Sequence, residues 1–325
     1  MPRRKRMSTV ADRRREILAQ RSAMKEVYGA GQDTVNPHTI VRGPDCWHLF
    51  YGAWPGGQNL EKRHATSDDL VVWTKQEPVL LRGKPGDCDH AEVSEASVIE
   101  HDGRWYMVYA CRPRPEASRR FSVAVSDDLW HWEKIPGDGS PVFIPLREWS
   151  GWTEDGVLEC KDPWVIEYEG RYLMYFVCQN RWGDSCLALA ESADLVHWED
   201  RGPLMTFQRI ENKFQGPSGF EVPRVFEKDG RYWIFVMNFW GTQYASGDDP
   251  FHFGEWTVLG PWHGASVFSD EQDRWFITHA LRPFGQPSTR LRPMIGPLQG
   301  LCLGGIVWSE GVPVPVDLRH VVGEE

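Results

Sequence analysis

The amino-acid sequence predicts an all-β fold, a five-bladed β-propeller with an N-terminal α-helical extension. A hairpin-like phrase occurs five times in the 325 residues, and a second, shorter phrase follows four of its copies. A propeller repeats one four-stranded unit around an axis, so its blades require phrases in this order. A β-sandwich, the alternative all-β architecture, does not explain so long a repeat.

Each copy of the first phrase has the pattern of a β-hairpin: a short apolar strand, a turn and an aromatic-rich strand. The clearest turns are Asp102-Gly103, Glu169-Gly170 and Asp229-Gly230. Successive copies are about 43 to 67 residues apart, within or somewhat above the usual spacing of blades. The five copies read VNPHTIVRGPDCWHLFYGA, SEASVIEHDGRWYMVYA, KDPWVIEYEGRYLMYFV, FEVPRVFEKDGRYWIFVM and WHGASVFSDEQDRWFITHA.

The second phrase reads SDDLVVW at 67–73, SDDLWHW at 126–132 and SADLVHW at 192–198, with a degenerate GDDPFHF at 247–253. Serine and aspartate favour a turn because their side chains bond to nearby backbone groups. The final aromatic residue suits the interface between blades. Most of the 17 tryptophans are therefore expected to pack in the core rather than to bind sugar.

Residues 1–28 predict an amphipathic helix, with Thr9 as its N-cap, because basic residues cluster there and apolar residues recur at near-helical intervals. We expect residues 1–30 to form a basic helical extension and residues 31–325 the propeller. Such a helix could bind nucleic acid or a membrane, but packing on the body or on a partner subunit is the simpler expectation. A homodimer formed through this helix follows from the second alternative.

The composition of the chain disfavours several classes of protein, among them nucleic-acid-binding and membrane-spanning proteins. A net charge of −10 disfavours general nucleic-acid binding, and the apolar runs are far shorter than the roughly 20 residues of a membrane span. The seven cysteines are odd in number and lack CxxC spacing, which disfavours a disulfide framework or structural zinc. We expect a cytoplasmic protein that binds neither nucleic acid nor membrane.

One polar residue lies near the start of each first phrase, where the strand predicted to line the axis begins. Counting back from the aligned aromatic residues gives Asn36, Glu95, Asp162, Glu221 and His263. Any one acid there could simply cap a turn or bind solvent, but five in register should converge on one pocket. Paired carboxyls are what glycosidic bond cleavage needs, and like charges near each other keep one of them protonated. Glu221 is the candidate acid.

These phrases resemble the five-bladed propeller glycoside hydrolases of families 43 and 32, over roughly residues 34–317. The stretch NPHTIVRGPDCWHLFY with HATSDDLVVW is similar to the first blade of invertase-like family 32, and HGASVFSDEQDRWFITHA to the fifth blade of family 43. The motif KDP resembles the family's Arg-Asp-Pro, which implies that Asp162 stabilises the transition state and tunes the acid. FEVPRVF resembles Glu-Cys-Pro, which implies that Glu221 is the general acid. The resemblance also implies calcium or water near His263; otherwise no cofactor or metal is expected.

The sequence departs from the family where the first-blade aspartate, the nucleophile or base, is replaced by Asn36. An amide carries no charge with which to attack a sugar or deprotonate water. Glu95 is the nearest substitute, with Asp33 and Asp89 behind it, and it could alternatively be a rim carboxylate paired to Arg112 or Arg224.

Two further explanations stay open. Phosphate could be the attacking group, held by basic residues, or the site could be silent and bind a sugar or another small molecule. A repurposed biosynthetic enzyme is a further alternative. The basic residues considered for a phosphate site are Arg112, Arg114, Arg224, Lys161 and His263.

The leading hypothesis is an intracellular enzyme that cleaves or transfers a glycosidic bond of a small glycoside or oligosaccharide. Its predicted catalytic residues are Glu221, Asp162 and Glu95. A role for His279 is weaker, since it lies at the far end of its hairpin. The predicted substrate-binding residues are Asn36, His263, Arg224, His90 and Arg112. The sugar, the linkage, the stereochemistry and the oligomeric state stay open.

Overall fold

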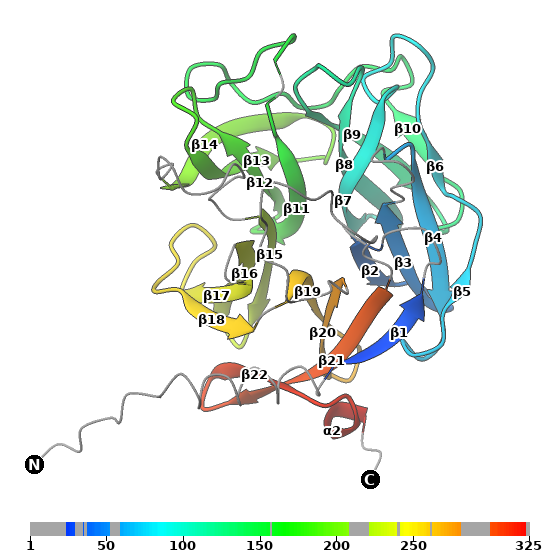
Figure 1. Ribbon diagram of the computed structural model, residues 1–325, viewed down its shortest axis with the longest axis vertical. Helices are drawn as coiled ribbons and strands as arrows, with labels where there is room; N and C mark the ends of the chain where they lie inside the picture. The colour runs from blue at the N-terminus through cyan, green and yellow to red at the C-terminus, as the bar shows by residue number, and fades with distance from the viewer. Residues whose placement is uncertain are drawn as a thin grey trace, which may run out of the picture.

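The computed structural model describes residues 24–29, 35, 38–52, 59–156, 158–207, 221–238, 241–260, 262–280 and 300–322. Within these residues the chain forms five antiparallel sheets of four or five strands. Figure 1 shows the sheets arranged around a common centre.

The first three blades follow one another along the chain. Blade 1 contains β2 (His38–Arg42), β3 (Trp47–Gly52), β4 (Glu61–Ser67), β5 (Thr74–Lys75) and β6 (Leu80–Leu81). Blade 2 contains β7 (Glu92–His101), β8 (Arg104–Arg112), β9 (Arg120–Ser126) and β10 (Glu133–Ile135). Blade 3 contains β11 (Lys161–Tyr168), β12 (Arg171–Gln179), β13 (Ser185–Ser192) and β14 (Trp198–Phe207).

The last two blades complete the set, and blade 5 combines an early strand, β1, with strands from the C-terminal part of the described chain. Blade 4 contains β15 (Glu221–Lys228), β16 (Arg231–Asn238), β17 (Gly241–Gly247) and β18 (Thr257–Gly260). Blade 5 contains β19 (His263–Ser269), β20 (Trp275–Ala280), β21 (Gly300–Ser309), β22 (Val312–Val316) and, from the N-terminus, β1 (Lys25–Gly29). A short helix, α2 (Arg319–Val322), packs on β21.

The inner strands close the ring. Strand β7 contacts β2 and β11, β15 contacts β11 and β19, and β19 returns to β2. The first strand of every blade therefore lies at the centre, and the five-bladed propeller predicted from the repeat is confirmed.

The predicted N-terminal helix is wrong at its end, because Lys25–Gly29 is a strand. It pairs antiparallel with β21, whose edge offers unpaired backbone groups. Tyr28 is buried, and its hydroxyl lies 3.0 Å from that of Tyr51 in blade 1. The rest of the predicted helix, Thr9 included, lies outside the described residues.

The second phrase forms the turn that the sequence predicts. In blade 2 the backbone N–H groups of Trp130 and His131 both donate to Asp128 Oδ1 at 2.8 Å. The Trp132 indole donates to the carbonyl of Leu129, and its ring packs against the apolar cluster between blades 1 and 2. Likewise, the Trp198 indole donates to the carbonyl of Leu195, and its ring packs against the apolar cluster between blades 2 and 3.

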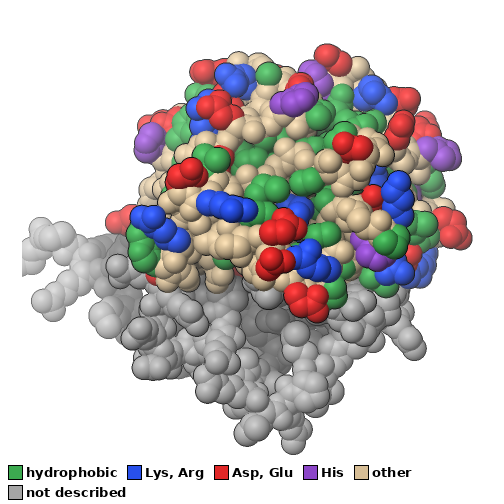
Figure 2. Space-filling model, turned by 90° about the horizontal axis from the view of Figure 1, so that it is seen from above, with side chains coloured by type: hydrophobic (Ala, Val, Ile, Leu, Met, Phe, Trp, Pro, Cys, Tyr) green, Lys and Arg blue, Asp and Glu red, His purple; other side chains and the backbone are tan. Residues whose placement is uncertain are grey.

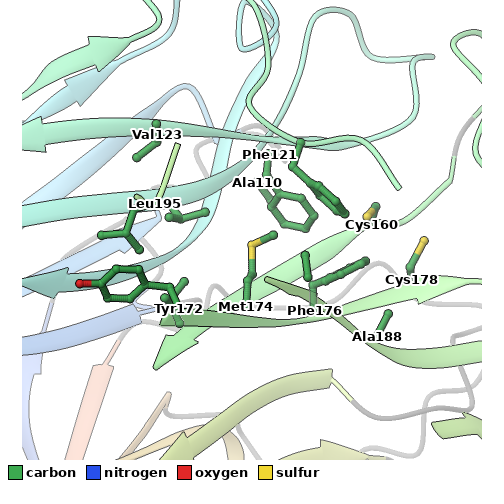
Figure 3. Close-up of a cluster of buried hydrophobic side chains, with 14 residues drawn as sticks. Ala110, Phe121, Val123, Cys160, Tyr172, Met174, Phe176, Cys178, Ala188 and Leu195 are labelled. Atoms are coloured by element: carbon green, nitrogen blue, oxygen red, sulfur yellow. The ribbon is translucent and has the colours of Figure 1, made fainter. Parts of the chain in front are cut away.

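The cores lie between neighbouring blades. Figure 3 shows one of them, where Phe121 of β9 faces Met174 and Phe176 of β12. The Phe121 and Phe176 rings meet edge to face, with centroids 5.5 Å apart. On the surface, acidic and basic side chains are interspersed over the face seen in Figure 2.

Candidate active site

Four of the five inner strands are irregular at the same place. The ladder register shifts between Val93 and Ala96 in β7, and between Lys161 and Trp164 in β11. It shifts in the same way at residues 221–224 of β15 and 263–266 of β19. A bulge bends a strand and turns a side chain away from its regular direction. The predicted acids of blades 2, 3 and 4 all lie at these bulges.

The acids do not occupy one equivalent position per blade, and that part of the prediction is wrong. Register places Lys161 opposite Val177 and Glu221 opposite Met237, so these two residues correspond to each other. Asp162 is therefore one residue further along its strand. The five positions were predicted by counting back ten to twelve residues from the aligned aromatic residues. A bulge adds one residue to its strand, and the sequence gives no sign of that extra residue.

Asp162 holds the backbone of the next blade. It is 3% exposed, and its Oδ2 accepts a hydrogen bond of 3.0 Å from the backbone N–H of Val222. Asp162 and Val222 have φ angles of 56° and 53°. Positive φ is strained for a β-branched residue such as valine, so the two bulges store strain beside Glu221.

Lys161 joins the two acids. Its Nζ lies 2.7 Å from Glu221 Oε1 and 4.0 Å from Asp162 Oδ2. Burial alone would lower the pKa of Lys161, but the charges of Asp162, Glu221 and Glu95 together raise it above its ordinary value. The lysine is therefore a fixed positive charge between blades 3 and 4.

The carboxyl of Asp162 is easily protonated. Burial raises its pKa to about 7, and Lys161 opposes this shift while Glu95 and Glu221 add to it. Asp162 therefore titrates near neutral pH, because burial and the neighbouring acids disfavour its charged form.

Glu95 differs from Asp162 in its electrostatics. Burial opposes its charge, but Arg119, whose Nη1 lies 3.9 Å from Glu95 Oε1, and Lys161 outweigh that effect and lower its pKa. Its Oε2 is buried and has no hydrogen-bond partner among the described residues. Glu95 is therefore an ionised carboxylate with one buried oxygen that lacks a hydrogen-bond partner in the described part of the chain. Two carboxyls whose surroundings shift their pKa values in opposite directions are typical of a general acid and a general base.

Arg224 is buried on the blade 1 side of the acids. Its guanidinium donates to the carbonyls of Pro223 and His38 and lies 4.5 Å from the ring centroid of Trp164. Burial lowers its pKa to about 10, while Asp162 and Glu95 oppose that shift. It contacts the acids electrostatically rather than through an ion pair.

Arg112 is tied to the wall of blade 2. Its Nε lies 2.5 Å from Glu92 Oε2, and its Nη2 lies 3.4 Å from Glu159 Oε1. Arg114 pairs with Asp155 and Glu154. These carboxylates already pair with two of the three arginines predicted for a phosphate site, Arg112 and Arg114.

The loop before β7 holds two of the weaker candidates. Asp89 is buried and accepts hydrogen bonds from the Tyr109 hydroxyl and the Gly83 N–H, so it anchors this loop. His90 Nδ1 lies 3.0 Å from the Gly83 carbonyl oxygen. Neither residue contacts the acids through a described interaction.

Comparison with known proteins agrees with this architecture. The family model described as the glycosyl hydrolases family 32 N-terminal domain matches residues 34–270. The chain belongs to glycosyl hydrolase family 32.

Two curated relatives of this family 32 chain are sucrose-6-phosphate hydrolases by name. The one from Bacillus subtilis (strain 168) is 27% identical over 176 residues, 52% of this chain and 34% of that protein. The probable one from Vibrio cholerae serotype O1 is 26% identical over 227 residues, 67% of this chain and 37% of that protein. The matches span about a third of the length of these relatives.

Solved structures share the fold. Fructan 1-exohydrolase IIa from Cichorium intybus superposes with a TM-score of 0.68 at 15% identity, covering 91% of this chain and 61% of that one. A thermostable family-43 glycoside hydrolase gives a TM-score of 0.65 at 15% identity, covering 89% of this chain and 95% of that one.

Several predicted residues of this family 32 chain lie beyond the description. Asn36 and Asp33 are outside the described residues, and His263 begins strand β19. His279 is buried, with its ring stacked on Trp262 at 6.1 Å. Within the described ranges no cluster of three or more histidine, cysteine or acidic residues could hold a metal ion. No helix found there is long and apolar enough to cross a membrane.

Sequence reasoning missed three residues around the acids. Arg119 and Lys62 lie outside the first hairpin of each blade, where the search was made. The pKa of Lys62 is lowered to about 8 by burial, against the attraction of Glu95 and Glu92. His38 donates to or accepts from the Thr278 hydroxyl at 2.8 Å, and burial lowers its pKa to about 3. No sequence motif marks any of the three.

Proposed function

We propose that this chain hydrolyses the glycosidic bond of a small glycoside or oligosaccharide. The observation that carries the proposal is the grouping of Glu95, Asp162 and Glu221 around Lys161, at the bulges of three neighbouring inner strands. Glu95 is held ionised, while the pKa of Asp162 is raised to about 7 by burial. Bond cleavage at a sugar needs one carboxyl that gives a proton and another that attacks or activates water.

Glu221 is the proton donor in this proposal. In this proposal the proton reaches Glu221 from Asp162, whose pKa is raised to about 7 and whose carboxyl lies beside the same Lys161 ammonium group. Binding of a sugar beside Glu221 lets that proton pass to the oxygen of the leaving group. Asp162 returns to its charged form as positive charge develops on the sugar, and thereby stabilises the transition state.

Glu95 supplies the negative charge that Asn36 cannot. Its ionised form and its oxygen without a hydrogen-bond partner in the described residues fit a nucleophile or a general base. Arg224 and Asn36 are assigned to substrate hydroxyl groups. The names of the family 32 relatives point to a fructofuranoside as the first substrate to try.

The test is an incubation of the protein with aryl-glycosides, aryl-fructosides and sucrose, each with and without phosphate. We expect hydrolysis of a fructoside that does not require phosphate. Turnover only with phosphate, giving a sugar phosphate, would replace hydrolysis by phosphorolysis. No turnover of any compound, with Glu221→Gln indistinguishable from the unsubstituted protein, would remove the proposal.

A further inference from the structure

Trp182 is the most exposed large hydrophobic side chain in the described part of the chain, with an exposed fraction of 69%. It lies between β12 and β13. Lys161, at the start of β11, is paired with Val177, so the end of β12 at Gln179 lies about 7 Å beyond the lysine along the strand. Trp182 is therefore on the same face of the propeller as the carboxyls.

The loop that carries Trp182 is built rigidly. Asn180 Oδ1 accepts hydrogen bonds of 2.9 Å from the backbone N–H groups of both Trp182 and Asp184. The Asn180 N–H donates to the Asp184 carbonyl at 2.9 Å, and Gly183 has a φ of 84°. A second segment braces the loop, since the Arg181 N–H donates to the Trp149 carbonyl at 3.0 Å. Because the loop is already ordered, binding of a ligand to its exposed side chain costs little conformational entropy of the backbone.

Arg181 supports the indole ring. Its guanidinium carbon lies 4.5 Å from the ring centroid of Trp182. No carboxylate in the described ranges is within ion-pairing distance of this arginine, so its donors stay available beside the ring. The pair presents an apolar plane with hydrogen-bond donors at its side.

We propose that Trp182 and Arg181 bind a sugar ring of an oligosaccharide whose cleaved bond lies at the acids, an inference that rests on the proposed function. The C–H groups of a sugar ring form an apolar face that stacks on an indole, while its hydroxyl edge accepts hydrogen bonds from a guanidinium. Sites for small molecules combine an aromatic surface with a few placed polar groups in this way. The site selects substrates longer than one sugar.

Exposure alone does not distinguish this tryptophan, because single exposed apolar residues are common. Val72 is 68% exposed, but it lies in the turn after β4, at the opposite end of the blades from the acids. Trp182 differs by its place on the acid-bearing face, by the braced loop and by the stacked arginine. Val72 is therefore the matched control.

The experiment is calorimetric titration of the Glu221→Gln protein with fructose and with a fructo-oligosaccharide. This measurement needs no turnover, so it can succeed or fail independently of the hydrolysis assay. We expect the oligosaccharide to bind more tightly than fructose, and Trp182→Ala to reduce that advantage about tenfold. Trp182→Phe, which keeps an aromatic plane, should retain most of it, and Val72→Ala should leave it unchanged.

Thermal unfolding of each variant shows whether the fold is intact. The inference would be overturned if adding Trp182→Ala to the Glu221→Gln protein left the ratio of oligosaccharide affinity to fructose affinity unchanged. Failure of the Glu221→Gln protein to bind any oligosaccharide more tightly than fructose would overturn it as well.

Discussion

Lys161 Nζ lies 2.7 Å from Glu221 Oε1, so a cation of blade 3 is bound to the acid at the corresponding position of blade 4. The same ladder position therefore carries opposite charges in two neighbouring blades. Because each bulge follows directly after this position, Asp162 and Glu95 are turned toward the same charged group. The bulges thus place three acids around one lysine, and Lys161 is therefore the first residue to test.

Replacing Lys161 with methionine should destabilise the protein in a pH-dependent way. The substitution leaves Asp162, Glu221 and Glu95 without their shared positive charge, and breaking a buried pair costs about 3 kcal/mol. The cost should be largest at pH 8 and smaller at pH 5, where the acids can take up protons. Urea unfolding at both pH values measures it, with Lys161→Arg as the charge-conserving control. An equal loss at pH 5 and pH 8 would contradict the electrostatic explanation.

Replacing Asp162 with asparagine should stabilise the protein above neutral pH. The pKa of Asp162 is about 7 in the folded protein against an ordinary value of 3.8. The folded protein thus binds more protons between these values, and Asp162 makes it lose stability as pH rises through that window. Asparagine does not titrate and still accepts the Val222 hydrogen bond. We expect a gain on the order of 2 kcal/mol at pH 8 and little change at pH 4.

Measurement of urea unfolding over this pH range checks the prediction. Catalysis should fall in the same variant, because the charge that stabilises the transition state is lost. A stability difference that stays constant from pH 4 to pH 8 would show that Asp162 is not the titrating group.

Removing the carboxyl of Glu95 should abolish most of the hydrolysis. A positioned acid or base contributes on the order of 10²- to 10⁴-fold, so Glu95→Ala should lose at least 100-fold in kcat/KM. Formate or azide should restore part of the rate if the missing group is a carboxylate near the sugar. Full activity in Glu95→Ala would contradict the catalytic role and would show that Glu95 only stabilises the structure beside Arg119.

Asn36→Asp tests whether Glu95 has taken over the first-blade role. In the unsubstituted background we expect no gain in rate, because Glu95 already supplies a negative charge. In the Glu95→Gln background the new aspartate should raise the rate at least tenfold, since it restores a carboxylate where related sequences place one. A large gain from Asn36→Asp alone would indicate that the chain had lost its nucleophile and that Glu95 does not replace it.

The fold was predictable because its signals are local and repeated. Hairpin turns such as Asp102-Gly103 and the Ser-Asp turns at Asp128 and Asp194 depend on neighbouring residues only. The strand at Lys25–Gly29 was mistaken for a helix because its partner, β21, lies more than 270 residues away in sequence (Gly29 pairs with Gly300). No periodicity within the segment reports such a pairing.

The sequence indicated the acids Asp162 and Glu221 and the neighbouring cations Lys161 and Arg224, but it did not indicate Arg119 or Lys62. Asp162 and Glu221 stand in motifs at the start of inner strands, where a search by repeat finds them. Arg119 and Lys62 reach Glu95 from other strands, β9's leading loop and β4, and their contribution depends on packing between blades. The pKa of Glu95 depends on burial opposed by Arg119 and Lys161, and the pKa of Asp162 on burial, Lys161 and the neighbouring acids, so the two shifts could be assigned only from coordinates.

The repeated Ser-Asp turn should contribute to stability independently of the site. Asp128 accepts backbone hydrogen bonds from Trp130 and His131 at 2.8 Å, and it thereby fixes the turn that places Trp132 between blades. Loss of a comparable capping side chain costs about 1 kcal/mol, so Asp128→Ala should lower the free energy of unfolding by roughly that amount. Asp128→Asn keeps the accepting oxygen and should lose less. Because the turn is distant from the acids, kcat/KM should stay unchanged in both variants, and a fall in activity at full folding would show that the turn and the site are coupled.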